Sequence, residues 1–184
     1  MKKRAFMMAP IVVTLLAFFV WHTPLRGPLT QNEIDVFMHN QTESGGSSWA
    51  VSETFEAFLR SDDGRPFVMI NLMEIRDVAV YPDGSETDRY SGAQADAAYG
   101  QSVLPLLLAR GSYPIANATR SFTILNSLGS EAGAFDVAAI VRYRSRRDLL
   151  SMISSEAFLE AEVHKWASLE NSLLRLRVTA RRLA

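Results

Sequence analysis

The sequence predicts a protein of the α+β class, with a folded domain whose elements follow the order β-α-β-β-α-β. Two segments carry this prediction. The run FVMINLMEI at residues 67–75 is almost entirely apolar, which is typical of a central strand that is covered on both faces. The segment LRLRVTAR at residues 174–181 alternates apolar residues with basic or polar ones, which is the period of a strand with one buried and one solvent-exposed face.

The elements between these two strands follow from helical spacing and turn residues. Apolar residues at helical spacing predict a helix over 93–110, and Gly111 is a good residue to end it. Ser145 stands at a helix-cap position, three residues before Asp148. The other predicted elements are strands over 120–126 and 135–143, a short helix through residue 153 and a longer helix over 156–171.

This order is the plan of ferredoxin-like folds, in which two helices cover one face of a four-stranded antiparallel sheet. The opposite face then stays open, and its apolar side chains form a patch too large to remain in water. A second copy, packed sheet against sheet, covers such a patch. We therefore expect a homodimer that forms through the open sheet face.

The N-terminal segment has the pattern of a membrane anchor. Residues 5–21 carry no charge, and three basic residues precede them at positions 2–4. A helix of this length spans roughly 25 Å, at the short end of what crosses a bilayer. A cleaved signal peptide is the alternative, but no small-residue cleavage site follows, so we favour an uncleaved signal anchor over residues 1–22. The positive-inside rule then predicts a single-pass protein of the bacterial inner membrane, held through residues 5–21, with its C-terminal domain in the periplasm or exterior.

Residues 23–65 form a predicted connector with two short helices. Thr30 and Glu33 have the spacing of a capping box, and a helix of about ten residues follows. A second helix is expected over 50–60. Neither helix can bury a core alone, so both should pack on the domain of residues 66–184 or on a protein partner in the membrane.

Composition narrows the function classes. The 19 Lys and Arg residues are balanced by 20 Asp and Glu residues, which argues against a nucleic-acid partner. The chain has no Cys, which excludes disulfides, thiolate nucleophiles and Cys-based metal sites. The sequence has no GxGxxG, P-loop, HExxH or GxSxG motif. We therefore predict neither a metal site nor a cofactor.

Three strings carry a resemblance to a known family: FVMINLMEI, FDVAAIVRYRSRRDLLSMISSEAF and HKWASLENSLL. They resemble signatures of a bacterial family of unknown function in the dimeric α/β barrel superfamily, over roughly residues 66–180. Two positions depart from the family pattern, Phe135 where Trp is more frequent and Arg144 where Pro is usual. The superfamily includes cofactor-free monooxygenases, isomerases of small aromatic lactones and haem-handling enzymes. The resemblance implies a ferredoxin-like fold with a pocket, and it implies no particular substrate.

Asn71 and Arg142 are candidate pocket residues because each interrupts an apolar strand. A buried amide needs a partner, so Asn71 either bonds to neighbouring backbone or orients a polar atom of a ligand. A buried cation needs a carboxylate, and for Arg142 this is Glu74, Asp136, a twin subunit or a ligand.

Tyr90 and His164 complete the set of candidate pocket residues. Tyr90 precedes the first helix of the domain, where it can close a pocket mouth or join the core. His164 follows Glu160 by one helical turn, so the two form a surface pair, or His164 is a general base that lines the pocket.

These observations favour a membrane-anchored, exported domain that binds a small molecule or serves as an accessory unit. One alternative is a metal-free monooxygenase or isomerase that acts on a small aromatic or carbonyl compound, which rests on the resemblance alone. Another is a structural subunit of a membrane protein complex.

Overall fold

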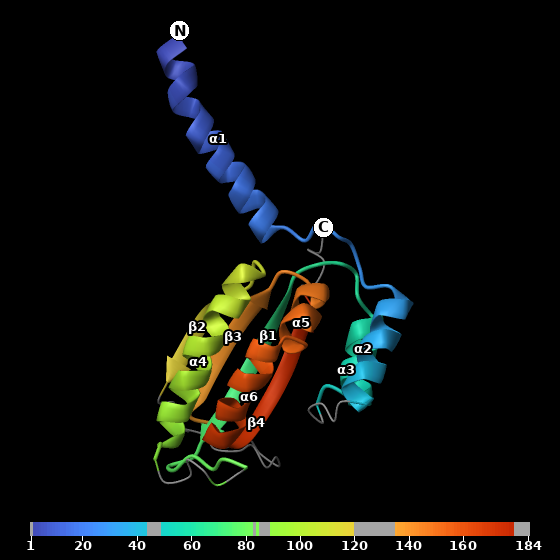
Figure 1. The fold of residues 1–184 in the computed structure, drawn as a ribbon, viewed down its shortest axis with the longest axis vertical. Helices are drawn as coiled ribbons and strands as arrows, with labels where there is room; N and C mark the ends of the chain where they lie inside the picture. The colour runs from blue at the N-terminus through green and yellow to red at the C-terminus, as the bar shows by residue number, and fades with distance from the viewer. Residues whose placement is uncertain (1, 44–48, 83, 85–88, 120–134, 179–184) are drawn as a thin grey trace, which may run out of the picture.

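The computed structural model describes residues 2–43, 49–82, 84, 89–119 and 135–178. Its centre is a four-stranded antiparallel sheet of order β2-β3-β1-β4 (Figure 1). The strands are β1 (Phe67–Ile75), β2 (Tyr113–Thr119), β3 (Val137–Tyr143) and β4 (Leu169–Val178). Helices α4 (Gly92–Ala109), α5 (Arg146–Ile153) and α6 (Glu156–Ser168) lie together on one face of this sheet. The predicted α+β class and β-α-β-β-α-β order are therefore confirmed.

Several element boundaries differ from the prediction. Strand β3 begins at Val137 rather than at residue 135, and the second connector helix begins at Glu53 rather than at residue 50. The strand after α4 is Tyr113–Thr119, whereas the segment 120–126 predicted for it lies outside the described residues. Helix α6 ends at Ser168, three residues before its predicted end, because β4 already begins at Leu169 and pairs with Ile75 there. The last strand is therefore longer than its alternating segment indicates.

Local side-chain caps explain where the domain helices begin. Ser91 and Gln94 form a complete capping box at the start of α4, with bonds of 3.2 and 2.9 Å. The hydroxyl of Ser145 accepts the backbone N–H of Asp148 at 3.1 Å at the start of α5, as its position in the sequence predicts. Gly111 follows α4 with a φ of 65°, a conformation that favours glycine.

The two connector helices belong to the main hydrophobic core. They are α2 (Gln31–Glu43) and α3 (Glu53–Arg60), and they lie beside α5 in Figure 1. The predicted capping box of α2 is present, because Glu33 Oε2 accepts the Thr30 N–H at 2.8 Å and Thr30 Oγ1 accepts the Glu33 N–H at 3.3 Å. The side chains that these helices bury in the core are Ile34, Phe37, Phe55 and Leu59.

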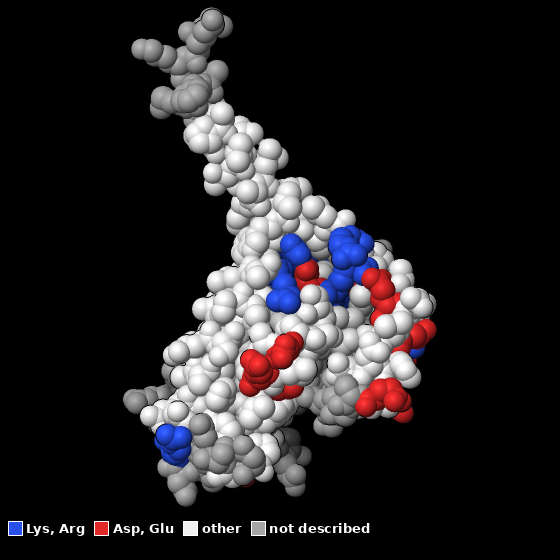
Figure 2. Space-filling model, viewed as in Figure 1, with Lys and Arg blue, Asp and Glu red and all other residues white. Residues whose placement is uncertain are grey.

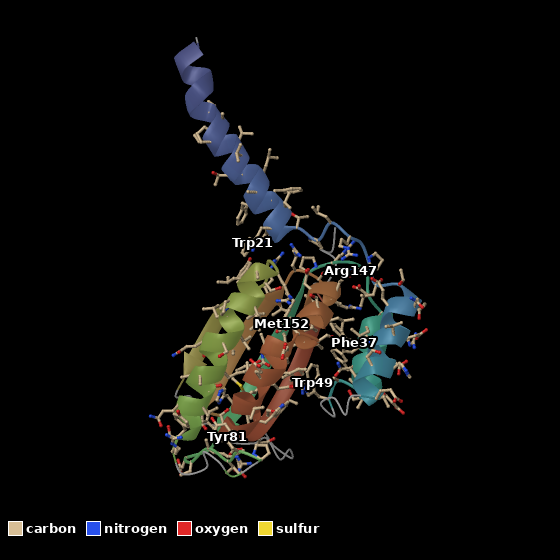
Figure 3. All side chains as sticks on the ribbon, viewed as in Figure 1. Trp21, Phe37, Trp49, Tyr81, Arg147 and Met152 are labelled. Atoms are coloured by element: carbon tan, nitrogen blue, oxygen red, sulfur yellow. The ribbon has the colours of Figure 1, made fainter. Side chains whose placement is uncertain are left out.

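Helix α1 (Lys2–His22) extends away from the rest of the protein (Figure 1). Its last turn contacts the domain, where the Trp21 indole N–H donates to the Leu108 carbonyl at 2.6 Å and the Trp21 ring stacks on Tyr113 with centroids 5.9 Å apart (Figure 3). In the part of the chain that the structure describes, no helix is both long enough and apolar enough to cross a membrane. The anchor over residues 1–22 stays a prediction.

The alternation of β1 separates an inner sheet face from an outer one. Phe67, Met69 and Met73 are buried under the helices. The outer face is defined by the side chains that alternate with the buried ones, and the described helices leave it uncovered in Figure 1. Its apolar members are Val68, Ile70 and Leu72 in β1, Ala138 and Ile140 in β3, and Leu173 in β4.

Candidate ligand cavity

A cavity of about 470 Å³ lies between the inner sheet face and the helices that cover it. Its walls come from all four strands and from α4, α5 and α6, and Trp49 lines it from the connector. This volume is within the range of pockets that hold small molecules. Most of the wall is apolar, and the apolar lining includes Met69, Met73, Val103, Leu107, Val141, Met152 and Phe158.

The exposure of the lining residues shows where the cavity opens. The lining side chains of β1 and α6 are buried and form its floor. The exposed lining residues are Ala97, Gly100, Gln101 and Leu104 on α4, together with Pro114 and Asn117 on β2. The mouth therefore lies between α4 and the edge strand β2, and the surface over α4 is largely uncharged (Figure 2).

Asn71 is a polar group on the inner wall, on the buried face of β1. Its side chain is 9% exposed and its Nδ2 donates to the Ala139 carbonyl at 3.3 Å. Within the described residues its side-chain oxygen accepts no hydrogen bond, although the residue lines the cavity. Asn71 thus bonds to neighbouring backbone and also presents an acceptor to whatever the cavity holds.

Lys165 provides the only amine among the described lining residues. Its side chain is buried in α6 at 8% exposure, and its Nζ lies 5.6 Å from the ring centroid of Tyr99 and 5.1 Å from that of Trp166. Burial lowers the pKa of Lys165, and the negative charges of Glu162 and Asp96 only partly oppose this. The site therefore favours the neutral amine more than water does.

Asp96 lines the same cavity from α4, and its pKa shifts in the opposite direction. Desolvation raises the pKa of Asp96, while the positive charge of Lys165 works against the rise. Burial also raises the pKa of Tyr99, which lines the cavity from α4 as well. Glu162 on α6 accepts the indole N–H of Trp49 at 3.1 Å, which holds Trp49 against the helix (Figure 3).

Of the four candidate residues drawn from the sequence, Asn71 lines this cavity and the others lie elsewhere in the described structure. Tyr90 is 38% exposed and packs edge-on against Tyr81, at a centroid distance of 6.5 Å. His164 contacts the same residue, because its Nδ1 lies 2.8 Å from the Tyr81 hydroxyl. Tyr81, rather than the predicted Glu160, is thus the hydrogen-bond partner of His164.

Arg142 points to the outer side of the sheet, where it contacts the end of α1. Its guanidinium donates to the carbonyls of Gly111 at 3.2 Å and His22 at 3.1 Å, and it lies 5.4 Å from the ring centroid of Tyr113. The predicted carboxylate partner Asp136 instead accepts the backbone N–H of Ile75 at 3.0 Å. Arg142 therefore helps to hold α1 in place, and the cation is satisfied by carbonyls instead of a carboxylate.

The sequence patterns above do not single out Lys165, although one signal for it exists. The chain has three lysines, Lys2, Lys3 and Lys165, against sixteen arginines. Lys165 is therefore the only lysine of the folded domain. The structure buries this single lysine of the domain beside the cavity.

Comparisons with known proteins give a structural likeness. No protein-family model matches the chain, and no curated protein matches it. Two crystal structures of the RPA0582 protein, described as a protein of unknown function from Rhodopseudomonas palustris, share 28% identity with it. The structure of the methylated form has a TM-score of 0.62 over 72% of this chain and 94% of its own. The fold described above therefore occurs in a second protein.

Two other solved structures are more distant. SnoaB, a cofactor-independent oxygenase from Streptomyces nogalater, has 8% identity and a TM-score of 0.39 over 65% of this chain and 97% of its own. A dimeric ferredoxin-like protein of unknown function from Thermobifida fusca has 17% identity and a TM-score of 0.36 over 62% of this chain and 91% of its own.

Proposed function

We propose that this protein binds a small, largely apolar molecule in the cavity between its sheet and helices. The observation that carries the proposal is the cavity itself, about 470 Å³ with apolar walls and a few converging polar groups. Pockets of this kind bury most of a small ligand and use the polar groups to orient it. Asn71, Asp96 and Lys165 are the polar groups placed to do so.

Neutral aromatic probes test this proposal directly. The full chain is titrated with 2-methoxynaphthalene, indole and p-cresol while its melting temperature and tryptophan fluorescence are followed. A bound ligand stabilises the native state by mass action, so at least one probe should raise the melting temperature in a concentration-dependent way.

A pair of variants on one helix locates the binding site. Ala97→Trp places a large ring at the mouth of the cavity and should weaken probe binding at least ~10-fold by steric exclusion. Ala93→Trp is the matched control, because Ala93 is also exposed on α4 but does not line the cavity. If no probe binds, or if both variants bind as the native chain does, the cavity is not a binding site.

We also propose that two copies of the chain pair through the outer sheet face. The apolar residues of this face, with Leu173 37% exposed, form a continuous surface across β3, β1 and β4 that a second copy would cover. Light scattering after gel filtration should give a dimer mass for the native chain and a monomer mass for Ile70→Lys, which puts a charge opposite Ile140. A monomeric native chain at tens of micromolar would exclude this pairing.

A further inference from the structure

The amine of Lys165 is placed as a nucleophile would be. Its side chain is more than nine-tenths buried, it lines the cavity, and its Nζ lies 5.6 Å and 5.1 Å from the ring centroids of Tyr99 and Trp166. Within the described residues it makes neither a hydrogen bond nor an ion pair within 4.0 Å. A structural lysine in such a position would normally have a carboxylate partner at contact distance.

The cavity shifts the protonation of Lys165 and of Asp96 in opposite directions. Apolar walls favour the neutral amine of Lys165, and desolvation keeps the Asp96 carboxyl protonated to a higher pH than in water. A desolvated lysine is an activated nucleophile toward carbonyl compounds, and a carboxylic acid nearby can donate a proton to a leaving oxygen. When the pKa values of two neighbouring groups shift in opposite directions, one group can act as an acid and the other as a base or nucleophile.

We propose that Lys165 captures an apolar aldehyde or ketone in the cavity as an imine, with Asp96 as the proton donor. This proposal rests on the proposed binding function, and it names the chemical class of the ligand. The size and the apolar walls of the cavity select a small aliphatic or aromatic carbonyl compound.

The step balances without an oxidant or a reductant. The lone pair of Lys165 Nζ forms a bond to the carbonyl carbon while the carbonyl π pair moves to oxygen, which takes up the proton that the nitrogen then releases. The nitrogen then supplies its electron pair to form the C=N bond, and the C–O bond breaks. The oxygen leaves as water with a proton from Asp96, and Asp96 recovers a proton from the nitrogen. The water therefore carries away two protons, which balance the two that the amine nitrogen has lost.

Reductive trapping on the full chain tests the proposal. The chain is incubated with 6-methoxy-2-naphthaldehyde and sodium cyanoborohydride at pH 6.5, and the adducts are located by mass spectrometry of peptides. Lys2 and Lys3 serve as internal references, because they are the only other lysines of the chain. We expect Lys165 to be labelled at least ~10-fold faster than either, with the ratio falling as the pH rises toward the ordinary lysine value of 10.5.

Variants connect the labelling to the site. Lys165→Met should abolish the fast adduct. When Lys165→Met is combined with Leu159→Lys, the new lysine should be labelled only as slowly as Lys2, because Leu159 lies on the exposed side of α6. Asp96→Asn should slow the labelling of Lys165 at least ~10-fold, as expected for the loss of a proton donor. The affinity of this variant for 2-methoxynaphthalene is measured in parallel, so that a loss of binding is distinguished from a loss of proton transfer.

The carbonyl-free analogue separates the two proposals. If 2-methoxynaphthalene binds and competes with the aldehyde, but Lys165 is labelled no faster than Lys2 and Lys3, the imine proposal is wrong and the binding function stands. If neither compound binds to the cavity, the proposed function itself fails. Labelling of Lys165 that is indifferent to Asp96→Asn would remove Asp96 from the step.

Discussion

A buried ion pair joins the connector to the domain, and its removal gives the sharpest test of the packing described above. The side chains of Arg146 on α5 and Asp62 after α3 are 1% and 2% exposed, and Arg146 Nε lies 3.6 Å from Asp62 Oδ1. Arg146 also donates to the Phe58 carbonyl at 2.5 Å, and its guanidinium carbon lies 4.2 Å from the centroid of the Phe58 ring. Asp62 accepts the backbone N–H of Leu29 at 2.8 Å.

Arg146→Met removes the cation and keeps most of the side-chain volume. The Asp62 carboxylate then remains buried without its positive partner, a change that typically costs about 3–5 kcal/mol of stability. Asp62→Asn in the same background removes the orphaned charge, so the double variant should recover about 2 kcal/mol relative to Arg146→Met alone. Leu29 and Phe58 belong to the connector, so the loss should appear in the cooperative unfolding of the whole domain.

Urea unfolding followed by circular dichroism measures these free energies, with the slope of the transition checked for constancy. Arg60→Met is the matched control, because Arg60 pairs with Glu56 at 2.7 Å and with Asp35 at 2.8 Å where all three side chains are between 36% and 60% exposed. An exposed pair contributes about 0.5 kcal/mol or less. A loss below about 1 kcal/mol for Arg146→Met, or strictly additive effects in the double variant, would refute the account of a coupled buried pair.

Two further predictions concern alkaline stability and the end of α1. Burial raises the pKa of Tyr143 above its ordinary value of 10.0. Above pH 10 the unfolded chain therefore loses a proton that the folded chain keeps, and the free energy of unfolding falls. Tyr143→Phe should reduce this fall between pH 9 and 11, as measured by urea unfolding at each pH. In Gly111→Ala the added methyl group overlaps the Trp21 carbonyl, and the φ of this residue is positive. The variant should therefore destabilise the folded protein by about 1–2 kcal/mol. It should also expose the Trp21 indole N–H to hydrogen exchange, which NMR spectra detect. Gly100→Ala is its control of opposite sign, since its methyl group meets open space within a helix and should stabilise by up to about 1 kcal/mol. The first prediction is wrong if the free energy of unfolding falls equally steeply with pH in the native chain and in Tyr143→Phe. The second is wrong if the Trp21 indole N–H of Gly111→Ala exchanges as slowly as in the native chain.

The parts of the fold that local chemistry determines could be predicted from the sequence. The buried run that forms β1 has the predicted bounds, and the caps at Ser145 and Thr30 act as their spacing indicates. Strand β2 could not be found in this way. Its sequence YPIANAT contains a proline and no alternation of apolar and polar residues, so its place in the sheet depends on pairing with β3.

The candidate site shows the same division. Asn71 stands out because a polar residue interrupts an apolar strand, and it does line the cavity. Arg142 interrupts its strand in the same way, but its partners are the carbonyls of His22 and Gly111, which are distant along the chain. Lys165 is buried at a cavity whose other walls come from distant parts of the chain, among them Trp49 and Tyr99. Such an environment arises only from tertiary packing, and no local pattern encodes it.

The edge formed by β2 limits how copies of this protein can associate. Pro114 has no N–H to offer an incoming strand, and the pairing of β2 with β3 shifts register between Pro114 and Ala116. The edge strand β2 is therefore poorly suited to pair with a strand of a neighbouring chain, which disfavours association by strand addition along this edge. The proposed contact between two outer sheet faces would close on itself after two copies, so an assembly formed in that way would stay finite.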